Sequence, residues 1–175
     1  MRLTSWDMTG HTLFQRRQAL GLLVATVAGG AGTAAAQAPG PHRLETVAKG
    51  LENPWSICFL PDGRMLVSER PGRLRVVTRE GAVSAAIAGV PAVWARGQGG
   101  LLDICLGPTF SQNRMLFLSF SEPRDGGAAT SVARAILSAD ATRLEDVQVI
   151  FRQQPASGGP VHFGSRIVAA RDGTL

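Results

Sequence analysis

Short runs of apolar residues, separated by turn residues, recur along the chain from about residue 44 onward. Similar stretches begin at Trp55 ("WSICFLPDGRMLVSER"), at Leu101 ("LLDICLGPTFSQNRMLFLSFSE") and at Gly164 ("GSRIVAARDGTL"). Each stretch indicates a strand, a turn and the start of a second strand. Apolar and polar residues also alternate in "RLRVVT", and "VARAIL" and "VQVIF" are further strand candidates. The pattern therefore predicts an all-β chain.

The spacing of the repeated stretch favours a β-propeller. Cys58 and Cys105 occupy the same place in the first two copies, 47 residues apart, and Val168 follows Cys105 by 63 residues. A recurrence of about 40 to 50 residues, lengthened once by a loop, is typical of propeller blades, which stack to bury their faces. A β-sandwich or barrel also uses short strands, but repetition of the whole strand-turn-strand unit favours the propeller.

About two blades and the start of a third fit before Leu175. A closed propeller needs at least about four blades. We therefore expect residues 44–175 to be the N-terminal part of a larger propeller domain. Alone, this part is expected to expose blade faces and sheet edges and to aggregate.

The first 36 residues have the features of an export signal. Arg16 and Arg17 precede a long stretch that lacks Asp, Glu, Lys and Arg, and this stretch contains three consecutive alanines ending at Ala36. A basic region, an apolar region and a small-residue cleavage site are the three parts of a signal peptide. We predict a signal over residues 1–36 and a short linker over residues 37–43.

Two further questions concern how this leader acts. Its glycines shorten the apolar run below the roughly 20 residues that span a membrane, which disfavours an anchor. The paired arginines, with Leu20 after them, resemble a twin-arginine signal, and Sec export is the alternative. Either route predicts a periplasmic or secreted protein without a membrane span in its mature form.

Composition and charge exclude disorder and a nucleic-acid partner. Hydrophobic residues make up 45% of the chain and charged residues 18%, which is typical of a folded domain. The formal net charge is +5, of which the leader contributes two charges. The remaining arginines are interspersed with acidic residues and do not form a basic patch with interleaved aromatics, as nucleic-acid binding requires.

The two cysteines, Cys58 and Cys105, lack the spacing of a metal site. Export permits a disulfide between them. Both lie in apolar, strand-like runs, where a free cysteine acts as a small hydrophobic residue. This position favours two buried thiols.

Two glycine-rich loops carry the candidate chemistry. The loop "VPAVWARGQGGLLD" contains Gln98 and precedes the second copy, and "QQPASGGPVHFGSR" contains His162 and precedes the third. Both loops enter the first strand of their blade, so both are expected at the same mouth of the propeller channel. Glycines there allow a flat ligand to approach the backbone. Ordinary tight turns and a structural histidine are the alternative interpretation.

These motifs resemble the soluble aldose sugar dehydrogenases that depend on pyrroloquinoline quinone (PQQ), a family grouped with glucose and sorbosone dehydrogenases. The resemblance spans residues 44–175 and includes "GLENPWSICFLPDGRMLVSERPGRLRVV", "GVPAVWARGQGGLLDICLGPTFSQNRMLFLSFSE" and "HFGSRIVAARDGTL". It implies a six-bladed β-propeller in the periplasm, an aldose sugar as substrate, PQQ across the channel mouth and calcium that helps to hold it. It leaves the electron acceptor unassigned.

The resemblance also implies roles for individual residues. His162 corresponds to the catalytic histidine, which takes the proton of the anomeric hydroxyl while the hydride passes to the quinone and a lactone forms. Gln98 corresponds to a residue that hydrogen-bonds the cofactor. Arg96 is a candidate for a quinone carboxylate, with a solvated loop charge as the alternative. Relatives commonly have Asn or Asp where this chain has Val161.

The remaining cofactor-binding residues and all calcium ligands of the family are expected beyond Leu175, so the chain alone is expected not to oxidise sugar. A non-catalytic exported propeller that binds a carbohydrate or a protein is the alternative function. A propeller lactonase ranks last, because the two loops lack a cluster of carboxylate and Asn metal ligands.

Four other polar or aromatic residues have more ordinary interpretations. Arg166 is expected either near the pocket or in an ion pair at a strand edge. Asp103 is expected to hydrogen-bond backbone within its blade. Trp55 and Trp94 are expected to pack.

Overall fold

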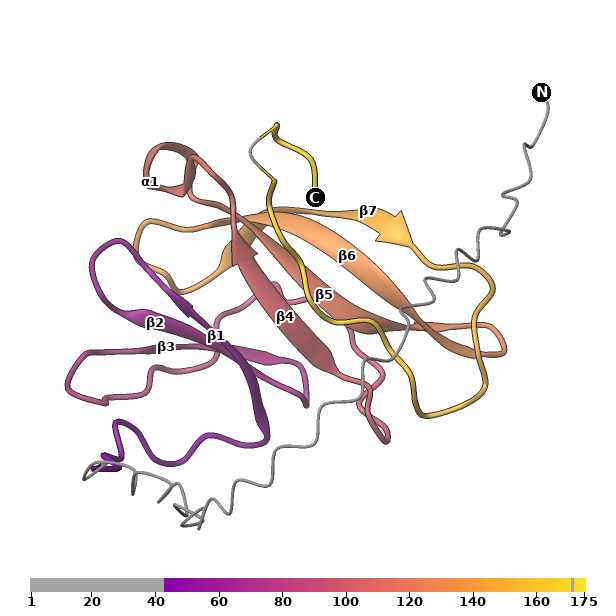
Figure 1. Ribbon diagram of the computed structural model, residues 1–175, viewed down its shortest axis with the longest axis horizontal. Helices are drawn as coiled ribbons and strands as arrows, with labels where there is room; N and C mark the ends of the chain where they lie inside the picture. Colours follow the sequence, from indigo (N-terminus) through magenta and orange to yellow (C-terminus); the bar gives the residue numbers. More distant parts are fainter. Residues whose placement is uncertain (1–42, 171) are drawn as a thin grey trace, which may run out of the picture. The chain divides into compact units, whose positions relative to one another are not determined.

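The computed structural model describes residues 43–170 and 172–175 (Figure 1). The predicted export signal, residues 1–36, lies outside this part, as does all of the predicted linker except Arg43. The described part is all-β, as the alternating apolar pattern predicts.

Within residues 43–170 and 172–175, seven strands form two antiparallel sheets, and in each sheet the strand order follows the chain. The first sheet has three strands: β1 (Pro54–Phe59), β2 (Met65–Glu69) and β3 (Arg73–Val77). The second has four strands: β4 (Leu101–Leu106), β5 (Met115–Arg124), β6 (Gly127–Leu137) and β7 (Leu144–Arg152). Each sheet has the up-and-down topology of one propeller blade.

A short helix, α1 (Phe110–Asn113), lies in the connection between β4 and β5. Within the residues that the structure describes, no helix is long and apolar enough to cross a membrane.

The segment after β3 completes the edge of the first sheet without forming a regular strand. The N–H of Ser84 donates to the carbonyl of Val76 at 2.8 Å, and the N–H of Ile87 donates to the carbonyl of Leu74 at 2.8 Å. The chain then passes to the second sheet, where Leu144 donates its N–H to the carbonyl of Ala88 at 2.8 Å. The first blade is therefore joined at its outer edge to the start of β7.

The main core lies between the two sheets. On β5, Leu116, Leu118 and Phe120 are buried in one cluster with Leu66 of β2 and Leu74 of β3. Alternate residues along a strand point to the same face, which explains why the predicted period-2 pattern produces this interface. A smaller cluster, made of Met65, Val67 and Val77 with Ala48, Leu51 and Val83 against it, covers the opposite face of the first sheet.

The same turn occurs in the first and third copies of the repeat. Leu60 donates its N–H to the carbonyl of Arg64, and Ala170 donates its N–H to the carbonyl of Thr174, both at 2.8 Å. In each turn an aspartate side chain accepts a further main-chain N–H at 3.0 Å. The sequence-derived repeat is therefore present in the backbone.

The strands predicted around the third turn differ from expectation. Described residues beyond Arg152, the last residue of β7, form no strand. Residues 163–167 instead lie beside β4 (Figure 1) and are bonded by side chains of the second sheet. A strand requires a hydrogen-bonded neighbour, and the described chain provides none for this stretch.

A buried carboxylate, Glu69 at the end of β2 in the first sheet, bonds residues on both sides of it. The Glu69 side chain is 1% exposed, and its Oε2 accepts from Arg73 Nε at 2.7 Å and Arg75 Nε at 3.0 Å. The N–H of Glu52 donates to its other oxygen. Burial opposes ionisation, but these donors outweigh it and lower the pKa of Glu69 from 4.5 to about 2.

We expect Glu69→Gln to lower the free energy of unfolding at pH 7 by about 2 kcal/mol, because the charge-assisted hydrogen bonds are lost. The lowered pKa means that this carboxylate stabilises the fold above pH 4.5 and stops doing so as the pH falls towards 2. The difference between wild type and variant should shrink over that range in denaturant titrations. Glu45→Gln, at an exposed position, is the control; a Glu69 difference that is constant with pH would contradict the assignment.

Candidate functional site

The two glycine-rich loops singled out in the sequence contact each other. The N–H of Gln98 donates to the carbonyl of Pro160 at 2.8 Å. In return, the Oε1 atom of Gln98 accepts the N–H of His162 at 2.8 Å. The structure thus brings Gln98 and the His162 backbone together across 64 residues of sequence, while their roles towards a cofactor or substrate stay predictions.

Gly97 is required by this close approach. Its φ is +54°, and a Cβ built there would lie 2.3 Å from the carbonyl oxygen of Pro160. Gly100, with φ +139°, similarly faces the carbonyl oxygen of Arg70 at 2.2 Å. The glycines of this loop therefore allow backbone to approach backbone, which is the tight-turn interpretation of the motif.

His162 has an exposed side chain and an unusual backbone. Its φ is +66°, in the left-handed region that few residues other than Gly, Asn, Asp and His adopt. The hydrogen bond from its N–H to Gln98 helps to hold this conformation. A solvent-accessible imidazole on a backbone held in this way is suited to exchange protons with a bound molecule.

Arg96 lies over an aromatic pair at the base of the same loop. Its guanidinium carbon is 5.8 Å from the centroid of the Trp94 ring, a cation–π distance. The Trp94 ring packs against Phe163 with centroids 5.9 Å apart and an interplanar angle of 57°. Trp94 therefore packs, as expected, and links the loop of Gln98 to the residue that follows His162.

Arg70 is a residue at this site that the sequence analysis missed. It follows β2 and reaches the Gln98 loop, where its Nη1 donates to the carbonyl of Gly97 at 2.6 Å. Its Nε is buried without a hydrogen-bond partner. The order of the strands could have predicted this contact. In an antiparallel blade, the turn after the second strand lies at the same end as the loop that enters the first strand.

Asp103 and Arg166 form the ion pair that was one of the two interpretations of Arg166. The Arg166 Nη1 atom is 3.3 Å from Asp103 Oδ1. Asp103 Oδ2 accepts the N–H of Ile167 at 2.8 Å. Asp103 does hydrogen-bond a backbone group, as expected. The expectation that this group lies within its own blade is wrong, because Ile167 belongs to the next repeat.

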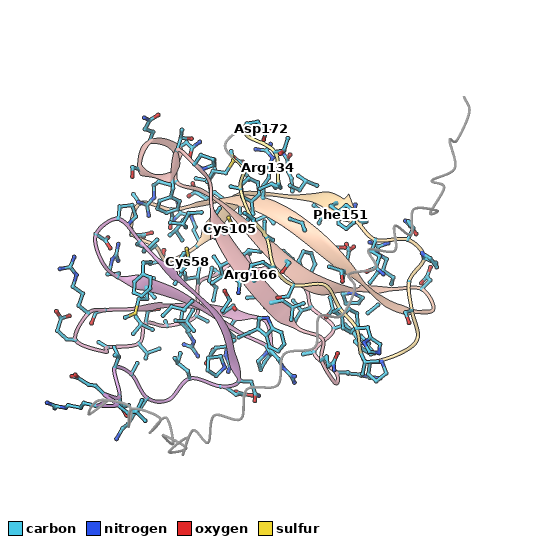
Figure 2. The ribbon with its side chains drawn as sticks, viewed as in Figure 1. Cys58, Cys105, Arg134, Phe151, Arg166 and Asp172 are labelled. Atoms are coloured by element: carbon cyan, nitrogen blue, oxygen red, sulfur yellow. The ribbon has the colours of Figure 1, made fainter. Side chains whose placement is uncertain are left out.

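Both cysteines are free and half-buried, so the interpretation as fully buried thiols is too strong. Cys58 lies on β1 and Cys105 on β4, the first strands of the two sheets (Figure 2). Burial is the main cause that raises the pKa of the Cys58 thiol. Trp55, expected to pack, is 46% exposed and donates from Nε1 to Ser165 Oγ at 2.9 Å.

The donors and acceptors of the two loops fit an organic anion better than a metal ion. Gln98 uses Oε1 for the loop contact, which leaves its amide N–H₂ group to donate, and the Arg96 side chain adds a positive charge. Among residues 43–170 and 172–175, no three His, Cys, Asp or Glu side chains gather as a metal site requires. The part of the chain described therefore provides polar donors at this position.

The fold and the loop pair define a class of protein, a β-propeller with a polar site where loops enter its blades. The family model for Glucose / Sorbosone dehydrogenase matches residues 51–175, and the chain belongs to this family.

Individual relatives agree with the family assignment. The aldose sugar dehydrogenase YliI of Escherichia coli strain K12 is 43% identical over 140 residues, which cover 79% of this chain and 38% of that protein. A solved structure described as glucose dehydrogenase is 48% identical, with a TM-score of 0.70 over 74% of this chain and 38% of its own. The PQQ-bound aldose sugar dehydrogenase of Streptomyces coelicolor is 30% identical, with a TM-score of 0.64 and coverages of 74% and 38%. This chain thus spans about two fifths of these relatives.

We expect Gly97→Ala to separate the two loops, because its methyl group would overlap the Pro160 carbonyl. Amide hydrogen exchange at Gln98 and His162 should speed up by about tenfold, since both N–H groups lose their partners. Gly50→Ala is the matched control, because Gly50 also has a positive φ (+81°) but open space around it. Equal exchange in the two variants would contradict the inference that the close approach to Pro160, and not only the positive φ, requires glycine at position 97.

Proposed function

We propose that this protein acts as a PQQ-dependent oxidoreductase that oxidises the anomeric carbon of aldose sugars to lactones. The observation that carries the proposal is the mutual contact of the Gln98 and His162 loops, which meet at one end of the two blades. Membership of the Glucose / Sorbosone dehydrogenase family and the PQQ-bound relative support the same chemistry.

In this proposal His162 is the general base. Oxidation of a cyclic aldose to its lactone removes a proton from the C1 hydroxyl and a hydride from C1. An exposed imidazole on a fixed backbone accepts that proton, and histidine is the side chain that most often transfers protons in enzymes. When bound, PQQ supplies the two-electron acceptor, and the redox chemistry belongs to the cofactor.

Gln98 and Arg96 fit a role in holding PQQ. The quinone carries carboxylates and carbonyl groups, which accept hydrogen bonds. The Gln98 amide N–H₂ donates to such acceptors, and the Arg96 guanidinium on the Trp94 ring provides a complementary charge.

The described residues do not fit calcium. That ion takes six to eight oxygen ligands in proteins, and the described residues hold no cluster of three candidate ligands.

We also propose that the protein is exported, on the basis of the leader sequence alone. Protein recovered from the periplasm should begin at Gln37, because cleavage is expected after Ala36. N-terminal sequencing of that fraction checks this. Recovery of an uncleaved chain in the cytoplasm would contradict both the signal and the location.

We expect His162→Asn, in the complete protein supplied with PQQ and calcium, to lower kcat for dye-linked sugar oxidation by about 10²- to 10⁴-fold. Asparagine tolerates the left-handed backbone at this position, so the loop keeps its shape and PQQ affinity should stay within about threefold. Unchanged turnover would remove His162 from the mechanism. Sugar binding without turnover in the wild type would instead favour a non-catalytic binding propeller.

A further inference from the structure

The main chain that follows the proposed base is held by side chains of the second sheet. Residues 163–167 belong to no strand, although they run beside β4 (Figure 1). The N–H of Gly164 donates to Thr130 Oγ1 on β6 at 3.0 Å. The carbonyl of Ser165 accepts from Ser119 Oγ on β5 at 2.6 Å. Because main-chain polar groups need partners when they leave water, these side chains determine where the stretch lies.

Asp103 on β4 provides a third attachment. Its side chain is 2% exposed and accepts the N–H of Ile167 at 2.8 Å and the hydroxyl of Ser56 at 2.7 Å. A buried carboxylate requires such donors. The Arg166 side chain is 78% exposed, so solvent weakens its ion pair with Asp103. The attachment therefore depends chiefly on Ser56 and Ile167.

Ser119 connects these attachments. It is 1% exposed, and its Oγ accepts the N–H of Asp103 at 2.9 Å while it donates to the Ser165 carbonyl at 2.6 Å. One hydroxyl thus uses its donor and an acceptor position to join β4, β5 and the stretch after His162. Deletion of the hydroxyl leaves both main-chain groups without this partner.

The attachments reach His162 over a very short piece of chain. The N–H of His162 is bonded to Gln98, and the N–H of Gly164 is bonded to Thr130. Only Phe163 lies between these two fixed points, and its ring packs on Trp94. Because each peptide unit is rigid, few backbone dihedrals between Ser165 and His162 can absorb a displacement, so a shift at Ser165 reaches the main chain that carries the His162 side chain.

We propose that Ser119 and Asp103 are positioning residues of the active site, which hold residues 164–167 and thereby fix the main chain that carries the imidazole of His162. This inference rests on the proposed function for its catalytic consequence. The positioning itself is a property of the chain without cofactor or substrate, and it has a readout of its own.

The test compares Ser119→Ala with Ser138→Ala in the complete protein. Both residues are buried, at 1% and 5% exposure, and each hydroxyl bonds two main-chain groups. Ser138 does so at the turn between β6 and β7, where it contacts residues 140–143. The two variants therefore remove the same chemical group, but only one removes it beside the stretch that follows His162.

With PQQ, calcium and an aldose, we expect Ser119→Ala to lose at least about tenfold in kcat, because displacements of about 1 Å cost up to about a hundredfold. The KM for sugar should change by less than about threefold, and Ser138→Ala should keep kcat within about twofold. Ser119→Thr, which keeps the hydroxyl, should restore kcat to within about threefold. Equal kcat in the two alanine variants would overturn the catalytic part of the proposal.

Amide hydrogen exchange in the chain without cofactor tests the positioning separately. Exchange at His162, Gly164 and Ile167 should rise by about tenfold in Ser119→Ala and stay unchanged in Ser138→Ala. Unchanged exchange in Ser119→Ala overturns the positioning role even if the enzyme is active. Faster exchange together with an active His162→Asn variant would overturn the proposed function and leave the positioning intact. If Ser119→Ala does not fold, Asp103→Asn is expected to give the same two changes, and its failure to do so overturns the proposal.

Discussion

The arrangement of the site depends on which hydrogen-bond partners the main-chain groups find where the chain leaves the sheets. Within the two sheets, main-chain groups bond the main chain of neighbouring strands. The chain from Pro160 to Ile167 lies in no sheet, and its main-chain groups bond Gln98, Thr130, Ser119 and Asp103 instead. These partners come from one blade and from the loop that enters it. The position of the exposed histidine is therefore determined by the second blade, even though the histidine precedes the third copy of the repeat.

The second strand of each blade carries a carboxylate held by several donors: Glu69 is buried, and Glu122 is partly buried. Glu69 on β2 is bonded by two arginines, and Glu122 on β5 is bonded by Arg152, Ser131 and Arg124. Burial opposes ionisation of Glu122, but these donors lower its pKa to about 2. Each carboxylate joins strands at the end of the blade where the turns approach the site loops. The charges of Glu69 and Glu122 thus hold the ends of β2 and β5 in place, although neither strand end carries a proposed catalytic group.

Much of the fold follows from the sequence because alternation and turn residues are local signals. The stretches from Trp55 and Leu101 form the expected strands, and the recurrence of 47 residues corresponds to two stacked sheets. The common position of Gln98 and His162 before successive copies of the repeat predicts one shared mouth for their loops, and the structure shows the two loops in contact. The sequence could not show that Asp103 bonds the next repeat or that Arg70 reaches Gly97. Those contacts join residues far apart in the chain, and no local pattern encodes them.

The left-handed backbone at residue 162 restricts which side chains evolution can place there, whatever the chemistry. A φ of +66° disfavours β-branched and bulky residues and favours Gly, Asn, Asp and His. A histidine that never varied among relatives would be explained in part by this geometry, before any appeal to proton transfer. Natural replacements at this position are thus most informative when they are asparagine, which preserves the shape of the loop and removes the base.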